Sequence, residues 1–406
     1  MLGSKPLSKL MKSLLHKYLI ALTAYDTLII FLFLISHPNI SAWLFDDVFV
    51  KKNGLLYYID FRPGYPPLGK LPYLFLYNTL NSEESILFYH LITLNVVLTI
   101  LFKLLKDITA KRKAVILTLT TAFYPPLIWV TIGNPHADLL ALLWLLLSIY
   151  FIKNKNPMMV GIFSGLGFLT KIYNVMLLLP AFVLFKGWER MVLLSSFLVT
   201  FFAVSAPFLA LDPLMYLSTF THHSLRGPSE SVFALLDGYF SHTGFRHPTY
   251  EATIYAWQFA LVYTSSNLDH FRYAWNYPQL RYLSLAFQMI FLLLFSLMAI
   301  RASHDAKMLK VISLASLSYF IFSAFWNPIL SIPHFILIVL ITLDAKIVYQ
   351  ILILIGFAVV DSLHFLVWFP GLPFGVHLGL LVVTVSRAIL TSIALYIAAG
   401  DRGGGS

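Results

Sequence analysis

The chain has 406 residues, of which 59% are hydrophobic and 11% are charged, and it contains no cysteine. Soluble domains carry about a quarter charged residues, so this composition excludes an ordinary soluble protein and predicts one that crosses a membrane many times. The absence of cysteine excludes disulfides, thiolate metal sites and a cysteine nucleophile. No small-residue cleavage site follows the first apolar run, so we expect that run to be an anchor rather than a removable signal.

Apolar runs that are suitable for helices follow one another along the whole chain. They cover residues 13–36, 84–105, 114–132, 138–152, 158–170, 172–185, 191–211, 279–300, 311–326, 329–343, 347–368 and 373–399. We therefore predict an all-α polytopic membrane protein with about twelve transmembrane helices (roughly ten to thirteen). The count is a range because a straight span needs about 20 residues and several runs are shorter. The neighbouring runs 158–170 and 172–185 are expected to be half-helices or a broken hairpin. We expect a single domain over residues 1–402, and residues 403–406 resemble an artificial linker.

The formal net charge of +10 raises the question of nucleic-acid binding. If the N-terminus is cytoplasmic, most of the 28 basic residues fall on the cytoplasmic side of the predicted spans. The positive-inside rule then explains the charge, so we predict membrane lipids and no nucleic acid as partners. The same topology places both termini in the cytoplasm and two long loops, residues 37–82 and 212–278, on the extracytoplasmic side.

The first long loop is polar and aromatic although it lies between two apolar runs. It contains Asp46, Asp47 and the tripeptide Tyr65-Pro66-Pro67, which cannot continue a helix. Loops of this length are usually functional or disordered, and the aromatic residues argue against disorder. Adjacent residues of a helix point about 100° apart, so we expect one aspartate to catalyse while the other caps a helix or binds a neighbouring group. A solvated acidic pair that caps a surface helix remains the alternative.

Asp26, Asp361 and Arg387 are charged residues that lie well inside predicted spans. Charges within a membrane are costly unless they are paired, so each is either functional or partnered. We predict that Asp26 is partnered and that Arg387 forms a structural ion pair with Asp361. The same three residues keep a transporter under consideration.

Further polar candidates lie at the extracytoplasmic ends of later spans. His136 and Asp138 open the span that follows the turn at Asn134-Pro135, and Asp138 suits the first turn of a helix. Positions i and i+2 do not share a helix face, so the two do not indicate a metal site. Lys171 has two interpretations of equal weight, a lysine that snorkels to the surface or one that binds a phosphate.

The second long loop carries a further group of candidates. Arg226 offers a planar set of donors suited to phosphate, and Ser229 is predicted to cap a helix that begins at Val232. His223 has a histidine neighbour, but no acidic residue is spaced with the pair as a metal site requires. Later, Pro328 and Pro333 flank a short turn that we expect on the extracytoplasmic side, and His334 follows Pro333.

The order of these motifs resembles integral-membrane glycosyltransferases of the GT-C superfamily, and most of all the mannosyltransferase-type branches that use polyprenyl- or dolichyl-phosphate sugars. The resemblance covers about the first 240 residues, and beyond them only the Pro/His turn. The motifs are Asp46-Asp47-Val-Phe-Val, Gly64-Tyr65-Pro66-Pro67-Leu68, Gly133-Asn-Pro-His-Ala-Asp138, Thr170-Lys171-Ile-Tyr173 and His223-Ser-Leu-Arg226-Gly227-Pro-Ser-Glu230-Ser231. The resemblance implies that Asp47, or its neighbour Asp46, is the general base, that Arg226 binds the donor phosphate, and that Lys171 assists. The acidic metal triad of the oligosaccharyltransferase branch is missing, so we expect no metal and no other cofactor.

The expected reaction is inverting transfer of a hexose, with mannose favoured, from a polyprenyl- or dolichyl-phosphate sugar to a lipid-linked or glycan acceptor. The leaving phosphate needs no protonation, so one carboxylate and cationic donors suffice. The candidates for substrate binding are Tyr65, His136, Asp138, His223, Glu230 and His334. A polytopic transporter or lipid flippase is the main alternative, although we find no internal repeat of the kind such proteins show. A purely structural membrane protein is the third.

Overall fold

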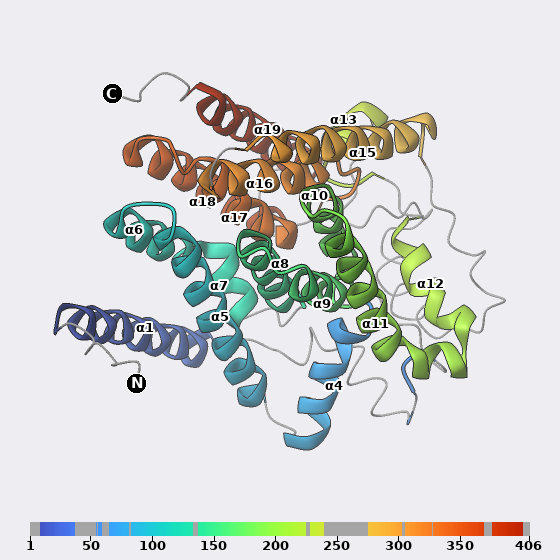
Figure 1. Ribbon diagram of the computed structural model, residues 1–406, viewed down its shortest axis with the longest axis horizontal. Helices are drawn as coiled ribbons and strands as arrows, with labels where there is room; N and C mark the ends of the chain where they lie inside the picture. The colour runs from blue at the N-terminus through green and yellow to red at the C-terminus, as the bar shows by residue number, and fades with distance from the viewer. Residues whose placement is uncertain are drawn as a thin grey trace.

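A computed structural model describes residues 9–36, 54, 56–58, 65–80, 83–132, 137–224, 228–238, 275–302, 305–326, 328–368 and 376–400. This part of the chain is all-α and contains no strand, only an isolated bridge between Ser229 and Phe325 (Figure 1). The helices are α1 (Lys9–Ser36), α4 (Pro67–Leu80), α5 (Glu83–Lys106), α6 (Lys111–Ala122), α7 (Pro125–Ile132), α8 (Asp138–Lys153), α9 (Pro157–Phe168), η1 (Ile172–Leu177), α10 (Leu178–Leu184), α11 (Trp188–Leu211), α12 (Pro213–Ser224), α13 (Val232–Asp237), α15 (Gln279–Ile300), α16 (Asp305–Ile321), η3 (Pro328–Leu330), α17 (Ser331–Ile341), α18 (Ile347–Trp368) and α19 (Val376–Gly400).

Every apolar run of the sequence coincides with one of these helices or with a broken pair. The run 114–132 bends by 53° between α6 and α7, where Pro125 and Pro126 cannot continue the backbone hydrogen bonds of the preceding helix. The predicted break within residues 158–185 is confirmed, because α9 ends at Phe168 and the 3-10 turn η1 begins at Ile172.

Fewer of the described helices have the length and composition needed to cross a membrane than the sequence led us to expect. Five of the described helices are long and apolar enough to cross a membrane: α5, α11, α15, α18 and α19. The bent pair of α6 and α7 raises the number to six if it forms one span. The protein is therefore a multi-pass membrane protein, but the expected count of about twelve spans is not confirmed.

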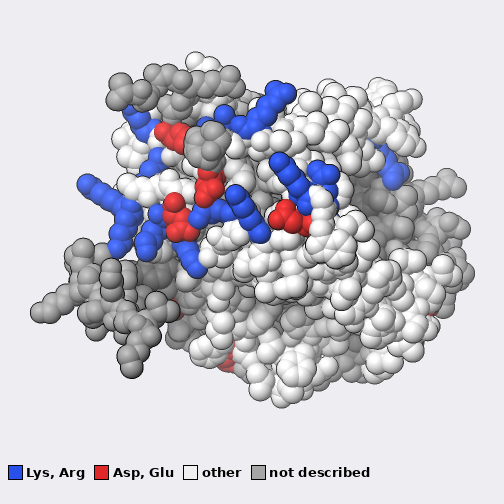
Figure 2. All heavy atoms as spheres, viewed as in Figure 1, with Lys and Arg blue, Asp and Glu red and all other residues white. Residues whose placement is uncertain are grey.

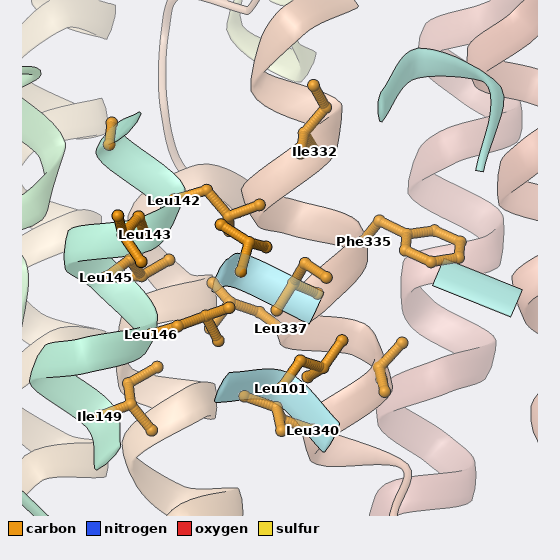
Figure 3. Close-up of a cluster of buried hydrophobic side chains, with 14 of the residues drawn as sticks. Leu101, Leu142, Leu143, Leu145, Leu146, Ile149, Ile332, Phe335, Leu337 and Leu340 are labelled. Carbon is orange, nitrogen blue, oxygen red and sulfur yellow. The ribbon is translucent and has the colours of Figure 1, made fainter. Parts of the chain in front are cut away.

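The short helix α17 lies at the centre of the core. All of its residues from Ser331 to Ile341 are buried, as expected for a helix that is apolar on every side. Figure 3 shows Leu337 and Leu340 of α17 among Leu101 of α5 and Leu146 of α8. A helix of this length cannot span a bilayer by itself, yet it needs no lipid contact because protein surrounds it.

Charged residues gather at one end of the helix bundle. Figure 2 shows lysines and arginines, with acidic residues among them, on one part of the visible face. Lys153 pairs with Asp107 at 2.6 Å and Lys310 pairs with Asp344 at 2.9 Å, so the loops between consecutive helices meet there. We call this the basic end. The opposite end, where α4, α13 and the beginnings of α8 and η1 lie, is called the distal end.

The charged residues within predicted spans have partners, as the sequence predicted. The Asn95 side-chain amide donates to both carboxylate oxygens of Asp26, at 3.1 and 2.9 Å. The Arg387 Nε donates to Asp361 Oδ1 at 3.1 Å, which confirms the predicted ion pair. Pairing removes most of the penalty that an isolated charge would carry in an apolar interior.

Candidate active site

Several predicted site residues lie outside the described part of the chain. These are Asp46, Asp47, His136 and Arg226. His223 belongs to α12, but its side chain is also outside the description. The remaining candidate residues lie within the described part of the chain.

Aromatic residues hold the first loop against the distal end. The Tyr58 ring is fully buried, with ring centroids 4.8 Å from Phe208 and 5.6 Å from Tyr216. Its hydroxyl donates to the Tyr65 carbonyl at 2.8 Å, which ties two parts of the loop together. Burial raises the pKa of the Tyr216 phenol, whose oxygen contacts the Ser205 hydroxyl at 2.5 Å. Such an aromatic cluster gives the loop the buried area that a stable conformation needs.

A buried ion pair joins the beginnings of α8 and η1. The Lys171 Nζ donates to Asp138 Oδ1 at 2.5 Å, and the two side chains are 8% and 0% exposed. Asp138 is the first residue of α8, where the helix dipole favours a negative charge. Lys171 precedes η1, at the break after α9. The interpretation of Lys171 as a snorkelling lysine is therefore wrong, because its ammonium group points into the protein.

The Tyr65 ring lies between this pair and a second lysine. The Lys171 Nζ is 4.9 Å and the Lys70 Nζ 5.7 Å from the centroid of the Tyr65 ring, within the range of cation–π interactions. Lys70 is buried although it lies in the first turn of α4. The neighbouring Gly69 lets the beginning of α4 pack closely against the backbone at Thr170. A Cβ at position 69 would lie only 2.7 Å from the Thr170 carbonyl oxygen. Sequence reasoning missed Lys70, although its place directly after the Tyr-Pro-Pro motif was a usable signal.

A second polar cluster, the Glu230 network, connects the second long loop with α18, α19 and Tyr124, the residue directly before α7. His364 contacts the Glu230 carboxylate through Nε2, and Arg387 donates to His364 Nδ1 at 2.7 Å. The Tyr124 hydroxyl donates to Asp361 Oδ2 at 2.6 Å, beside the ion pair of Asp361 and Arg387. A guanidinium group has no acceptor, so His364 Nδ1 must be the acceptor and Nε2 carries the proton that Glu230 accepts.

The predicted environment of Glu230 is therefore corrected. We expected it on an exposed extracytoplasmic loop, but it is 1% exposed and bonded to His364. Its φ of +49° is unusual for a residue other than glycine and is maintained by the bonds around it. The Ser229 N–H donates to the Ala324 carbonyl at 2.9 Å, and the Trp326 N–H donates to the Ser229 carbonyl at 2.7 Å. These two backbone bonds hold the loop at the residue directly before Glu230.

The predicted helix cap is also corrected. Ser231, not Ser229, caps α13, because the Ser231 hydroxyl oxygen accepts from the Ala234 N–H at 3.1 Å. The same hydroxyl donates to the Ala324 carbonyl at 2.7 Å. The helix begins where we predicted it, at Val232, and the residue directly before it has the extended backbone that a cap requires.

His334 does not lie in a turn as predicted. It is inside α17, 1% exposed, and packs edge-to-face on Trp326 with ring centroids 5.2 Å apart. The Trp326 ring also covers the Arg387 guanidinium at 4.6 Å. The short turn that we expected between Pro328 and Pro333 is present as η3, but it ends directly before α17, which contains both Pro333 and His334. His334 thus belongs to the interior beside the Glu230 network.

In the described ranges, no three His, Asp or Glu side chains come together as a metal site. The residues that do come together are lysines beside an aromatic ring, a carboxylate paired with one of them, and a hydrogen-bonded network of charged groups. Ammonium and guanidinium groups bind and stabilise anionic oxygen atoms. Metal independence itself stays a prediction.

These features define the class: an all-α, multi-pass membrane protein with buried polar side chains at the end opposite its basic end. The model of glycosyltransferase family 87 matches residues 64–324, which is more than half of the chain. The chain belongs to this family of GT-C-like integral-membrane glycosyltransferases. No curated protein matches the chain at a significant level.

The matched range differs from the range of the resemblance seen in the sequence. It extends beyond residue 240 and includes the network residue Glu230, but it begins at Gly64 and therefore excludes Asp46 and Asp47. His334 lies beyond its end. Family membership favours an enzyme over the transporter or flippase, and leaves the sugar, the donor, the acceptor and the base to be proposed.

Proposed function

We propose that the protein transfers a hexose, with mannose favoured, from a polyprenyl- or dolichyl-phosphate sugar to a lipid-linked or glycan acceptor with inversion at the anomeric carbon. The observation that carries this proposal is the buried pair of Lys171 and Asp138 under the Tyr65 ring, with Lys70 on the same ring. Two buried ammonium groups beside a half-buried aromatic ring suit a substrate that combines a phosphate with a sugar.

The proposed side of the membrane follows from the distribution of charge. The basic end carries the described lysines of the α5–α6, α8–α9 and α17–α18 connections, so the positive-inside rule assigns it to the cytoplasm. Helix α1 begins and α19 ends on that side of the molecule (Figure 1). The distal end then faces the extracytoplasmic side, in a prokaryotic plasma membrane or in the lumen of the endoplasmic reticulum.

The proposed mechanism needs one base and a stabilised leaving group. Asp47, with Asp46 as its alternative, accepts the proton of the acceptor hydroxyl while the hydroxyl oxygen forms a bond to the anomeric carbon. The bond between that carbon and the phosphate oxygen breaks, and the lipid phosphate leaves with the electron pair. Arg226 and Lys171 stabilise the charge that develops on this oxygen. A single displacement inverts the anomeric configuration, and the apolar helices beside the loops hold the prenyl chain.

The test uses the purified full-length protein in nanodiscs with radiolabelled polyprenyl-phosphate-mannose and membrane lipids as acceptors. We expect label to move to an acceptor, and we expect Asp47→Asn to abolish this transfer while leaving donor binding intact. Asp46→Asn is the matched control because it removes an equal charge from the neighbouring position. Loss of transfer in Asp46→Asn alone would assign the base to Asp46. Counterflow of the donor without any transfer would refute the enzyme and support a transporter.

A further inference from the structure

Several buried polar atoms have no hydrogen-bond partner in the described part of the chain, and four of them belong to one path of side-chain contacts at the distal end. They are Asp138 Oδ2, Tyr173 OH, Trp326 Nε1 and His334 Nδ1. Their side chains are at most 4% exposed. An unsatisfied buried donor or acceptor costs about 1–3 kcal/mol, so four of them in one region call for a physical explanation.

The four residues lie along one path of contacts. The Tyr173 ring is 5.3 Å from the Phe320 ring, and the Phe320 ring is 6.3 Å from the Trp326 ring. Trp326 in turn packs on His334. Tyr173 lies in η1 two residues after Lys171, whose ammonium group pairs with Asp138, so the Lys171–Asp138 pair lies at the other end of the path. The Tyr65 ring is only half-buried, so the region meets the protein surface beside it.

The chemistry of the four atoms defines what would satisfy them. The Thr391 hydroxyl donates to the Arg387 carbonyl at 2.8 Å, so its oxygen accepts from His334 Nε2 at 3.3 Å and His334 Nδ1 is a bare acceptor. Asp138 Oδ2 is an acceptor as well. The Trp326 Nε1–H is a donor, and the Tyr173 hydroxyl is both donor and acceptor.

A ligand that satisfies this set must donate and accept at several points. A phosphate cannot donate to Asp138 or His334, and an apolar chain satisfies none of the four atoms. Sugar hydroxyl groups can donate to Asp138 and His334 and accept from Trp326, and the apolar face of a sugar ring suits the aromatic side chains. We infer that Tyr173 and Trp326, together with Asp138 and His334, bind the hydroxyl groups of a sugar. This inference rests on the proposed function and extends it to the donor hexose or the acceptor glycan.

The test removes single polar atoms and keeps the rings. Tyr173→Phe and Trp326→Phe are compared with Phe320→Leu, a control that changes packing on the same path without removing a polar atom. Dissociation constants are measured in nanodiscs for polyprenyl-phosphate-mannose and for polyprenyl phosphate, which lacks the sugar. For a donor sugar, each Phe variant weakens binding of the first lipid about threefold to tenfold and leaves the second unchanged. The control weakens neither lipid selectively.

A second measurement distinguishes the acceptor from the donor. If both lipids bind normally but saturation-transfer NMR shows that the Phe variants lose contact with methyl α-D-mannopyranoside, the site holds the acceptor sugar. Unchanged binding of the two lipids and of the mannoside in both variants, with a normal unfolding temperature, overturns the inference. These are binding measurements, so they stand apart from the reaction. An Asp47→Asn protein that still transfers sugar would refute the proposed base and leave this site untouched.

Discussion

The buried ion pair of Lys171 and Asp138 makes a prediction whose size follows from its geometry. Lys171→Met removes the ammonium group that lies 2.5 Å from Asp138 Oδ1 and leaves a carboxylate with 0% exposure in its place. Breaking a buried pair on one side costs about 3–5 kcal/mol, because the remaining charge stays desolvated. Replacing both partners, by Lys171→Met with Asp138→Leu, removes both charges, and we expect this double variant to regain most of that loss.

The assay is denaturant unfolding in mixed detergent micelles, followed by tryptophan fluorescence. Lys310→Met is the matched control, because its pair with Asp344 has a similar distance of 2.9 Å but side-chain exposures of 15% and 50%. A surface pair of this kind contributes about 0–1 kcal/mol to the free energy of unfolding. The reasoning fails if Lys171→Met costs no more than the control, or if the changes at Lys171 and Asp138 are additive.

Other predictions concern the second long loop and the expected independence from metal ions. Arg226→Ala should weaken binding of polyprenyl-phosphate-mannose about tenfold or more, since a charge-assisted bond to phosphate is lost; unchanged affinity would argue against a phosphate contact. Ser231→Ala should lower the free energy of unfolding by about 1–2 kcal/mol, because the α13 cap is lost. The control Ser392→Ala, on the exposed side of α19, should lower it by only a few tenths of a kcal/mol. Equal effects of the two variants would show that the cap is not stabilising. Transfer should persist in EDTA, and a loss that manganese restores would reveal a metal site.

Helix positions followed from the sequence because burial in lipid or protein requires long apolar runs, and every such run became a helix. The broken run over 158–185 was visible for the same reason, since each half is too short to span a membrane. The pairing of Arg387 with Asp361 was also predictable, because an arginine among apolar residues needs an acidic partner nearby in the fold.

Other features depend on which helix ends meet. Lys171 and Asp138 are 33 positions apart, and their contact needs the break after α9 to face the beginning of α8. Glu230 and His364 are 134 positions apart, and no local pattern links them. The twelve apolar runs likewise did not reveal that a run such as α17 would be enclosed by other helices.

The sequence by itself determined a multi-pass, all-helical membrane protein with its polar residues concentrated in loops, because hydropathy depends only on local composition. The tertiary structure alone decided that Lys171 turns inward to Asp138, that Glu230 is buried against His364, and that His334 lies in the core. Long-range packing makes these choices, since a polar side chain reaches the interior only where the fold supplies a partner or, as we propose, where a substrate does.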